Sequence, residues 1–293
     1  MCSDAAYTIF SRHSDCLSFT SKEDIVTQGL VVISVVLPGL NELRHGYLPR
    51  IVDNLLTQQG EKELIAVVSP SQDGTLELLA QVPQIQVIET PVQNRAQRLN
   101  VGIAASQGEA VLLHHPATLL PAKEALIMLE KALQDPLIVW GGFRHQFDFD
   151  HWLLRYTSWY STVVRPRWGK ILYLDHCIFA RRSHLMKIGG VPDMDIFEDT
   201  VLSQRLNHYG APVILPGTVV TSARRFRSRG VYRQALLNQM LKVMYHLGID
   251  PKWMNRLYEQ KTQINVAYLE VGEARDRTDM VIKDDTSEMK PID

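Results

Sequence analysis

The run from Ile33 to Glu42, with the sequence ISVVLPGLNE, is the feature that most constrains the fold of this chain. Five or six β-branched and apolar residues stopped by Pro38 and Gly39 are typical of a strand that is buried on both faces. The amphipathic segment that begins at about Leu43 predicts a helix, so the unit is a strand, a loop and a helix. Ligands bind at the carboxyl ends of the strands in open α/β sheets. We therefore expect the loop after this strand to lie at the mouth of a binding site.

The pattern of a buried strand followed by a helix recurs along the first half of the chain. The expected strands are Leu64 to Val68, Ile85 to Glu89 and Ala110 to Leu113, and the expected helices are Thr75 to Gln81 and Asn94 to Ala105. This alternation predicts an α/β fold with a doubly wound, mostly parallel sheet and helices on both faces. Right-handed crossovers then bring the four strand ends to one edge of the sheet.

The second half of the chain is richer in aromatic residues. The partial alternation from Ile138 to Phe149 predicts an antiparallel edge strand, and Trp152 to Val164 predicts a helix that lines a cleft. The other expected elements are helices from Pro121 to about Leu133, Phe197 to Tyr209 and Val231 to Leu247, and strands from Tyr173 to Ala180 and Pro212 to Thr221. We interpret the apolar stripe of the helix at residues 231–247 as a core or dimer face rather than a membrane anchor.

Composition limits the class of protein. The formal net charge of the 293 residues is −1, so no overall basic field would recruit nucleic acid. No apolar run approaches the roughly 20 residues of a membrane span, and residues 1–10 lack the pattern of a secretory signal. The three cysteines (Cys2, Cys16 and Cys177) offer neither a disulfide framework nor a zinc pattern. We therefore expect a cytoplasmic protein with no nucleic-acid partner and no membrane span.

The chain divides into five parts by texture. We expect an N-terminal extension at 1–30, two parts of one domain at 31–120 and 121–227, C-terminal helices at 228–262 and a flexible tail at 270–293. The tail is rich in Asp, Glu, Lys and Thr and has little to bury, which is typical of disorder.

Five segments carry a family resemblance by their order and spacing. They are ISVVLPGLNE, SQDGT from Ser71, NRAQRLNVGI from Asn94, HHPAT from His114 and IFEDTVLSQRLNHYG from Ile196. Together with SARRF from Ser222 and GIDP from Gly248, they resemble a divergent family 2 glycosyltransferase of the GT-A fold over about residues 33–258. The resemblance implies that 31–120 is the nucleotide-binding part and that 121–227 is the acceptor-side part, with a small antiparallel portion beside the parallel sheet. It also implies an inverting enzyme that moves a sugar from a nucleotide-diphosphate donor to an acceptor hydroxyl.

The resemblance places a nucleotide-sugar site along the strand ends. The residues implied in binding are Pro38, Leu40, Asn41, Glu42, Ser69, Arg95, Arg98 and His115. Ser69 stands where the family usually has an Asp that contacts the base or ribose, and a serine can still form a hydrogen bond there. Arg95 and Arg98 share a helix face, and Arg95 could offset diphosphate charge through forked hydrogen bonds. The alternative is an ordinary turn capped by Asn41 with two surface arginines beside the site.

The segment from His114 to Thr118 departs from the family pattern. The carboxylate that would hold Mn²⁺ or Mg²⁺ against the diphosphate is replaced by Ala117. Hard divalent cations need oxygen ligands, and a methyl group supplies none. His115 keeps a histidine found in the similar subgroup, but one imidazole is a poor site for Mg²⁺. We therefore expect no metal cofactor, or weak binding of Mn²⁺ or Mg²⁺ at most.

The pair Glu198 and Asp199 resembles the acidic pair that serves catalysis in the family. Asp199 is the candidate base that accepts the proton of the acceptor hydroxyl, and Glu198 supports it. The alternative is that both acids only complement the dipole of a helix N-terminus. By the same resemblance, Asp175 and His176 would line the acceptor side. Arg224 and Arg225 would neutralise the leaving diphosphate or bind an anionic acceptor, unless they form a solvated basic loop.

Two interpretations of function remain open from the sequence. The first is an inverting glycosyltransferase with a UDP-sugar as the favoured donor and an unknown acceptor. The second is a catalytically silent relative that binds a ligand or regulates, which the loss of acids at positions 69 and 117 favours. A homodimer is compatible with the C-terminal helix. Fold alone does not choose between the interpretations.

Overall fold

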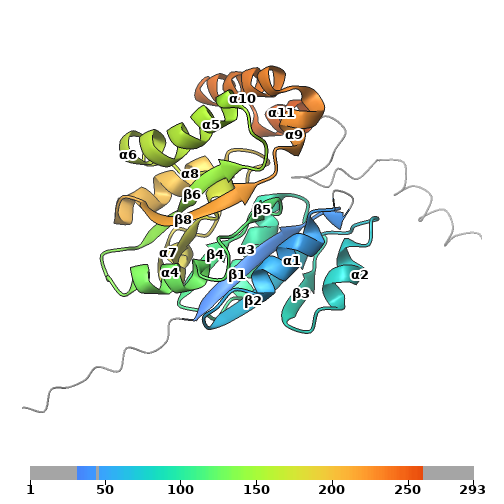
Figure 1. Cartoon of the computed structure of the whole chain (residues 1–293), viewed down its shortest axis with the longest axis vertical. Helices are drawn as coiled ribbons and strands as arrows, with labels where there is room; N and C mark the ends of the chain where they lie inside the picture. The colour runs from blue at the N-terminus through green and yellow to red at the C-terminus, as the bar shows by residue number, and fades with distance from the viewer. Residues whose placement is uncertain (1–31, 44–45, 260–293) are drawn as a thin grey trace, which may run out of the picture.

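The computed structural model of the protein describes residues 32–43 and 46–259. The expected N-terminal extension at 1–30 and tail at 270–293 lie outside these residues. Within them, the strands form an eight-stranded sheet in the order β3-β2-β1-β4-β7-β6-β8-β5. The sheet runs through the middle of the molecule, with helices packed on both faces (Figure 1). The predicted α/β class is confirmed.

The first four strands form a parallel half of the sheet. They are β1 (Ile33–Gly39), β2 (Lys62–Val68), β3 (Ile85–Glu89) and β4 (Ala110–Leu113). β1 pairs in parallel with β2 and with β4, and β2 pairs in parallel with β3. Every residue of β1 and β4 is buried. The four predicted strands are therefore confirmed, and their carboxyl ends meet at one edge as expected.

Alternate residues of β1 belong to two separate cores. Val35 and Leu37 pack in a cluster with α1 (Leu48–Leu56) and α4 (Ala125–Leu133). Val36 points the other way and packs with apolar residues of α3 (Arg95–Ala105). This arrangement follows from the period of two along a strand. The short helix α2 (Thr75–Ala80) precedes β3.

The other half of the sheet is mixed. It contains β5 (Thr118–Leu119), β6 (Trp140–Phe147), β7 (Phe179–Arg181) and β8 (Val213–Thr221). β7 pairs antiparallel with both β4 and β6, whereas β6 pairs in parallel with β8. The predicted antiparallel portion is confirmed, but the prediction of an edge strand at residues 138–149 is wrong. β6 lies inside the sheet, and its Gly141 brings the backbone so close to Val213 that a side chain would overlap the Val213 carbonyl.

Two other predictions need correction. A strand from Tyr173 to Ala180 is predicted, but Leu174–His176 forms a turn of 3₁₀ helix and the strand begins only at Phe179. The cause is Cys177, whose φ of 49° is incompatible with an extended backbone. The predicted helix from Pro121 begins later, at Ala125.

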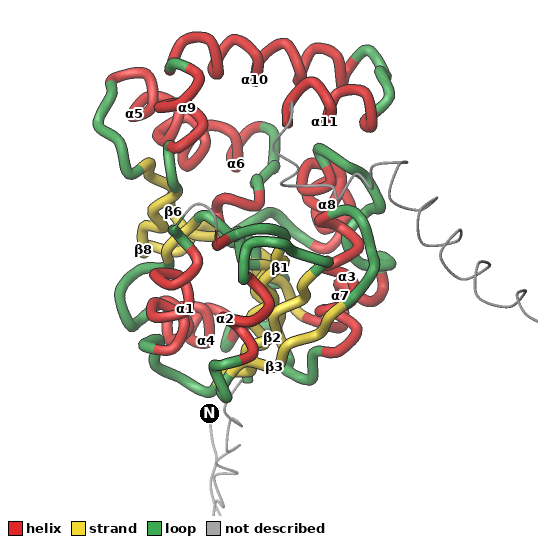
Figure 2. Tube along the Cα trace, turned by 90° about the vertical axis from the view of Figure 1, so that its right-hand side faces the viewer, coloured by secondary structure: helices red, strands yellow, loops and turns green. Residues whose placement is uncertain are grey.

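Two groups of helices gather at the end of the molecule farthest from α2 and β3 (Figures 1 and 2). One group is α5 (Trp152–Trp159), a π-helical turn (Tyr160–Val164) and α6 (Arg165–Trp168). The other is α9 (Arg224–Arg229), α10 (Val231–His246) and α11 (Pro251–Glu259). The remaining helices are α7 (Arg182–Lys187), α8 (Glu198–Leu206) and the 3₁₀ turn Asn207–Tyr209. No helix in the described part of the chain is long and apolar enough to cross a bilayer.

The contact between α3 and β1 yields a test of the parallel half. A Cβ added at Gly102 of α3 would overlap the side chain of Val36. Helix propensity alone would make Gly102→Ala stabilising by about 1 kcal/mol. Overpacking costs about 1–3 kcal/mol, so we expect urea denaturation to show a net loss of stability. The double variant Val36→Ala/Gly102→Ala should lose less than the sum of the two single changes. An additive double variant would contradict this packing.

Candidate active site

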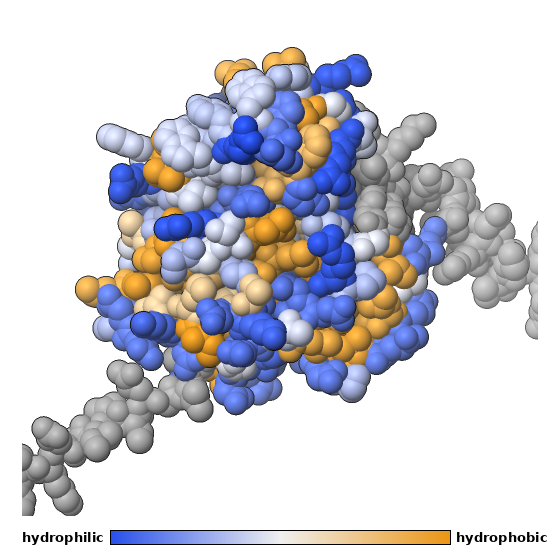
Figure 3. All heavy atoms as spheres, in the orientation of Figure 1, coloured by the Kyte–Doolittle hydropathy of each residue, from blue (hydrophilic) through white to orange (hydrophobic). Residues whose placement is uncertain are grey.

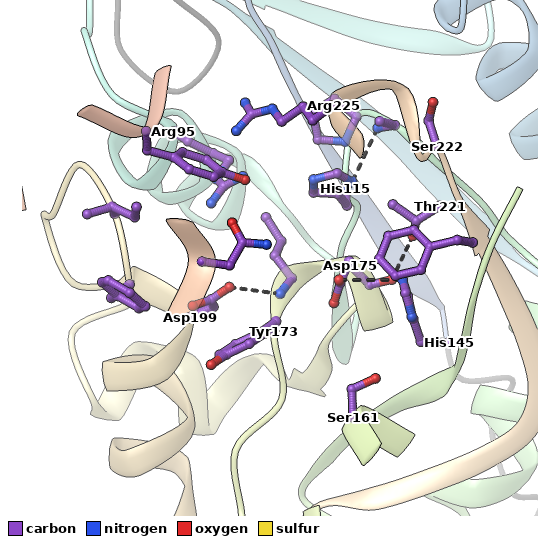
Figure 4. Close-up of a pocket in the computed structure, with 18 of the residues that line it drawn as sticks. Arg95, His115, His145, Ser161, Tyr173, Asp175, Asp199, Thr221, Ser222 and Arg225 are labelled. Atoms are coloured by element: carbon purple, nitrogen blue, oxygen red, sulfur yellow. Dashed lines mark hydrogen bonds and ion pairs between the residues drawn. The ribbon is translucent and has the colours of Figure 1, made fainter. Parts of the chain in front are cut away.

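A pocket of about 240 Å³ lies where the strand ends of the parallel half meet the C-terminal helices. Pro38 near the end of β1, Glu42 after β1 and His115 after β4 form one wall. α3 and α8 contribute Arg95 and Asp199, and α10 and α11 contribute side chains opposite them. Figure 4 shows these groups pointing into a common space. The pocket therefore occupies the edge at which a ligand is expected in a parallel sheet.

A buried ion pair joins the two halves of the pocket. Arg95, at the start of α3, places both Nε and Nη2 at 2.6 Å from Oε1 of Glu198, at the start of α8. The side chain of Glu198 is 2% exposed and that of Arg95 is 14% exposed. Burial lowers the pKa of Arg95, but the attraction of Glu198 and Asp199 outweighs it and the net shift is upward. The pair therefore stays charged and fixes the N-terminus of α8 against α3.

Asp199 is the carboxylate that this arrangement leaves on the pocket wall. Its Oδ2 accepts a hydrogen bond from the backbone N–H of Leu174 at 3.0 Å. Burial, followed by repulsion from Glu198, raises the pKa of Asp199 to about 7. A carboxyl group with a pKa near neutrality is suited to accept a proton in catalysis.

Asp175 faces Asp199 across the pocket among several imidazoles (Figure 4). Its Oδ2 lies 3.5 Å from Nε2 of His145, and its Oδ1 lies 3.9 Å from Nε2 of His176. Burial alone would raise the pKa of Asp175, but the neighbouring imidazoles and Arg165 hold it at about 2. Burial lowers the pKa of His145, and that of His176 to about 4. The two acids of the pocket thus differ in character, because Asp175 is held ionised and Asp199 can gain or lose a proton near pH 7.

Cations outnumber acids on the pocket wall. Six are Arg or Lys (Arg95, Arg98, Arg165, Arg224, Arg225 and Lys242), against the carboxylates Glu42, Asp175 and Asp199. Burial lowers the pKa of Lys242 to about 8, with Arg165 adding to the shift. An excess of positive charge on the pocket wall favours an anionic ligand.

Two of these arginines are held by aromatic rings. The guanidinium of Arg165 lies 3.9 Å from the ring centroid of Tyr173, and that of Arg225 lies 4.2 Å from the ring centroid of Tyr258. Their Nη1 atoms are buried and have no hydrogen-bond partner among residues 32–43 and 46–259. Stacking fixes each guanidinium plane and leaves N–H groups for a ligand.

The side chains around Ala117 do not offer the ligands that a divalent cation needs. Ala117 lines the pocket with a methyl group. Nδ1 of His115 accepts from the backbone N–H of Ala117 at 3.3 Å and lies 2.9 Å from Oγ1 of Thr118. In the described ranges, no group of three or more His, Cys, Asp or Glu side chains could hold a metal. Weak or absent metal binding stays a prediction, and the chemistry of this donor set favours it.

The structure brings most of the predicted site residues together. Those that line the pocket are Pro38, Glu42, Arg95, Arg98, His115, Asp175, Asp199, Arg224 and Arg225. Leu40, Asn41, Ser69, Glu198 and His176 are not among the residues that line it. Oγ of Ser69 donates to the carbonyl of Val92 at 2.6 Å and accepts from Nη1 of Arg98 at 3.0 Å. Ser69 therefore positions an arginine, and the side chain of Asn41 accepts a backbone hydrogen bond from Gln72 at 3.0 Å.

Sequence reasoning missed several groups that line the pocket, chief among them Arg165, Tyr173, His145 and Lys242. Arg165 lies at the start of α6 and Lys242 in the middle of α10. The available signal was the cleft predicted beside residues 152–164, which Thr157 and Ser161 do line. Nothing local in the sequence of α10 indicates that its polar side chains face a pocket.

A mixed sheet with a charged pocket at its parallel edge is the architecture of a nucleotide-sugar enzyme of the GT-A type, and comparisons with known proteins agree. The family model for glycosyl transferase family 2 matches residues 34–189, which is more than half of the chain. The chain belongs to glycosyl transferase family 2.

Solved structures share the fold at low sequence identity. S. aureus TarS 1-349 in complex with UDP-GlcNAc is 16% identical, with a TM-score of 0.53, over 65% of this chain and 58% of that chain. The mannosyltransferase PcManGT from Pyrobaculum calidifontis, in complex with GDP-Man and Mn²⁺, is 20% identical, with a TM-score of 0.54, over 73% of this chain and 64% of that chain. The chain thus spans less than two thirds of either structure. No curated protein matches its sequence.

The raised pKa of Asp199 predicts a pH dependence of folding. The pKa is 3.8 for an ordinary Asp and about 7 in the folded protein, so the folded state holds this proton more tightly. Stability contributed by this group is therefore present at low pH and lost as the pH rises towards about 7. Asp199→Asn should escape this loss. As the pH rises from 4 to 8, its free energy of unfolding should therefore gain up to about 4 kcal/mol relative to that of the unchanged protein.

Urea denaturation at several pH values measures this gain. The exposed Asp53 provides a matched control, because Asp53→Asn should follow the unchanged protein at every pH. If the free energy of unfolding of Asp199→Asn varied with pH in the same way as that of the unchanged protein, Asp199 would titrate normally.

Proposed function

We propose that the protein transfers a sugar from a nucleoside diphosphate sugar, with UDP as the favoured nucleotide, to a hydroxyl acceptor with inversion. The observation that carries the proposal is one pocket that holds both a carboxyl group with a pKa near 7 and more arginines than carboxylates. The first group suits proton removal and the second suits a diphosphate. The sequence resemblance favours UDP as the nucleotide. TarS, which has the same fold, was solved in complex with UDP-GlcNAc, and this supports the same choice.

The stacked arginines are the proposed partners of the diphosphate. A transferring sugar leaves a doubly charged phosphate group behind, and this charge must be stabilised as the bond breaks. Arg165 and Arg225 present buried N–H groups, and Lys242 lies 5.7 Å from the same Tyr173 ring that holds Arg165. Fixed cations of this kind can supply the stabilisation that a metal ion supplies elsewhere.

The proposed reaction is a single displacement. The acceptor oxygen attacks the anomeric carbon, a new C–O bond forms, and the bond between that carbon and the diphosphate breaks on the opposite face. The acceptor proton passes to Asp199, and the electron pair of the broken bond leaves with the diphosphate. Glu198 positions Asp199 through its ion pair with Arg95 and raises its pKa. Asp175 and His145 are placed to orient the acceptor or the sugar by hydrogen bonds.

One specific observation favours the second candidate, a relative that binds a nucleotide without turnover. Ser69 and Ala117 replace two acids of the family pattern. In the structure, the hydroxyl of Ser69 forms hydrogen bonds with Arg98 and with the carbonyl of Val92. Asp199 nevertheless keeps the environment of a base, with its carboxylate on the pocket wall. We therefore favour the enzyme.

Asp199→Asn tests the proposal. Removing a general base lowers the rate by about 10²–10⁴-fold, so release of UDP from a panel of UDP-sugars should fall by that amount. Binding of UDP, followed by calorimetry, should persist, because the asparagine can still accept from Leu174. Asp53→Asn should leave both readouts unchanged. Unaltered turnover in Asp199→Asn would remove the base assignment, and UDP binding without turnover in the unchanged protein would favour the silent relative.

A further inference from the structure

α5, which forms one side of the pocket, has polar side chains toward the pocket and aromatic side chains on its outer face. α5 and the π-helical turn after it direct Thr157 and Ser161 into the pocket. Their outer face carries Trp152, Tyr156, Trp159, Tyr160 and Val163, each of which is at least 39% exposed. A surface helix of a soluble protein normally has the opposite arrangement, with its apolar face turned inward. The outer face is therefore built for contact with something other than water.

α10 also has an apolar outer face, although its inner side packs Leu237, Leu241 and Met244 into a core cluster. Asn238 and Lys242 face the pocket, and Gln234 is 2% exposed. The outer face carries Tyr232, Leu236, Met240, Val243 and, at the C-cap, Leu247, with exposures from 48% to 73%. The sequence predicts a core or dimer face for this stripe; a core is wrong for these exposed side chains, and a dimer face stays a prediction.

The two outer faces belong to one end of the molecule. Nε1 of Trp152 donates to Oη of Tyr232 at 3.1 Å, which joins α5 to α10. Figures 1 and 2 place α5, α6 and α10 together at this end, and Figure 3 shows orange and pale side chains along its upper rim. Trp168 of α6 adds a side chain that is 86% exposed. We call the outer faces of α5, α6 and α10 the aromatic face.

The segments that form the aromatic face are free of acidic residues. Residues 151–174, with α5 and α6, contain four Lys or Arg, and residues 231–249, with α10, contain two; neither segment contains an Asp or Glu. The whole chain has a net charge of −1, so positive charge is concentrated here. Arg167, Lys170 and Arg233 of these segments are exposed. The exposed Asp150 just before α5 lies 2.6 Å from Arg155.

We propose that the aromatic face docks on an anionic lipid bilayer. Trp and Tyr side chains are suited to the boundary between headgroups and acyl chains. Aliphatic side chains on the same face can enter the apolar layer while exposed Lys and Arg contact the anionic headgroups. The proposal is independent of the reaction proposed above, since it concerns only the outer sides of these helices.

Two other occupants fit less well. A symmetric dimer through the aromatic face would bring the same unbalanced positive charge onto itself, because a two-fold interface pairs one patch with its own copy. A nucleic acid would satisfy the charge, but it offers no apolar layer for Leu236, Met240 and Val243. The bilayer complements both properties of the face.

Cosedimentation of the full chain with vesicles tests this proposal. We expect binding to vesicles of phosphatidylcholine and phosphatidylglycerol at 3:1, and at least about tenfold weaker binding to phosphatidylcholine alone. Four of the five tryptophans are exposed at Trp152, Trp159, Trp168 and Trp253, whereas Trp140 is buried. Tryptophan emission should therefore shift to shorter wavelength on binding to the anionic vesicles.

Paired variants separate the apolar component of vesicle binding from the electrostatic component. Leu236→Ser/Val243→Ser should weaken vesicle binding at least about tenfold, and Lys170→Glu/Arg233→Glu should abolish the preference for anionic lipid. Leu137→Ser changes a leucine that is 84% exposed on the loop after α4 and should leave binding unchanged. Unaltered UDP binding and thermal unfolding in these variants would show that they fold.

Three results would overturn the proposal. The first is no cosedimentation of the full chain with the anionic vesicles. The second is a dimer in analytical ultracentrifugation that persists with anionic vesicles present and that Leu236→Ser/Val243→Ser dissociates. The third is binding to a single-stranded oligonucleotide that exceeds binding to the vesicles at equal salt.

Discussion

The ion pair between Arg95 and Glu198 is the interaction on which the rest of the site depends. It joins the first residue of α3 to the first residue of α8 through 2.6 Å contacts between largely buried groups. A buried pair of this kind is costly to break, because either partner alone would be an uncompensated charge. It also keeps a negative charge beside Asp199, which together with burial raises the pKa of Asp199 to about 7. One interaction thus sets both the geometry and the protonation of the proposed base.

The second constraint is the positive charge that surrounds this base. The pocket gathers arginines from segments far apart in the sequence, and aromatic rings hold Arg165 and Arg225 in place. Ala117 removes the oxygen ligand that a divalent cation would need, while the arginines remain. The helices that carry Arg165 and Lys242 turn these two cations inward. The same helices leave Trp168, Leu236 and Met240 exposed on their outer sides, which links the pocket to the aromatic face.

Local signals explain which parts of the structure follow from the sequence. The four parallel strands and the helix with Gln97 and Asn94 in a capping box have strong local patterns, and they are found where they are predicted. The turn at Cys177 depends on a positive φ, and none of the residue types around Cys177 predicts one. β6 lies inside the sheet because Gly141 permits close approach of a neighbouring strand, which is a tertiary effect. Site residues within motifs were predicted, whereas Arg165 and Lys242 reach the pocket only through the packing of α6 and α10.

The central claim is that fixed arginines take the place of a metal ion at the diphosphate. Calorimetric titration with UDP, first in EDTA and then in Mn²⁺, tests it most directly. We expect the Kd of the unchanged protein to differ by less than about threefold between the two conditions, since less than 1 kcal/mol of binding would come from the metal. Ala117→Asp should gain a clear dependence on Mn²⁺. An increase in affinity of tenfold or more with Mn²⁺ in the unchanged protein would contradict the account.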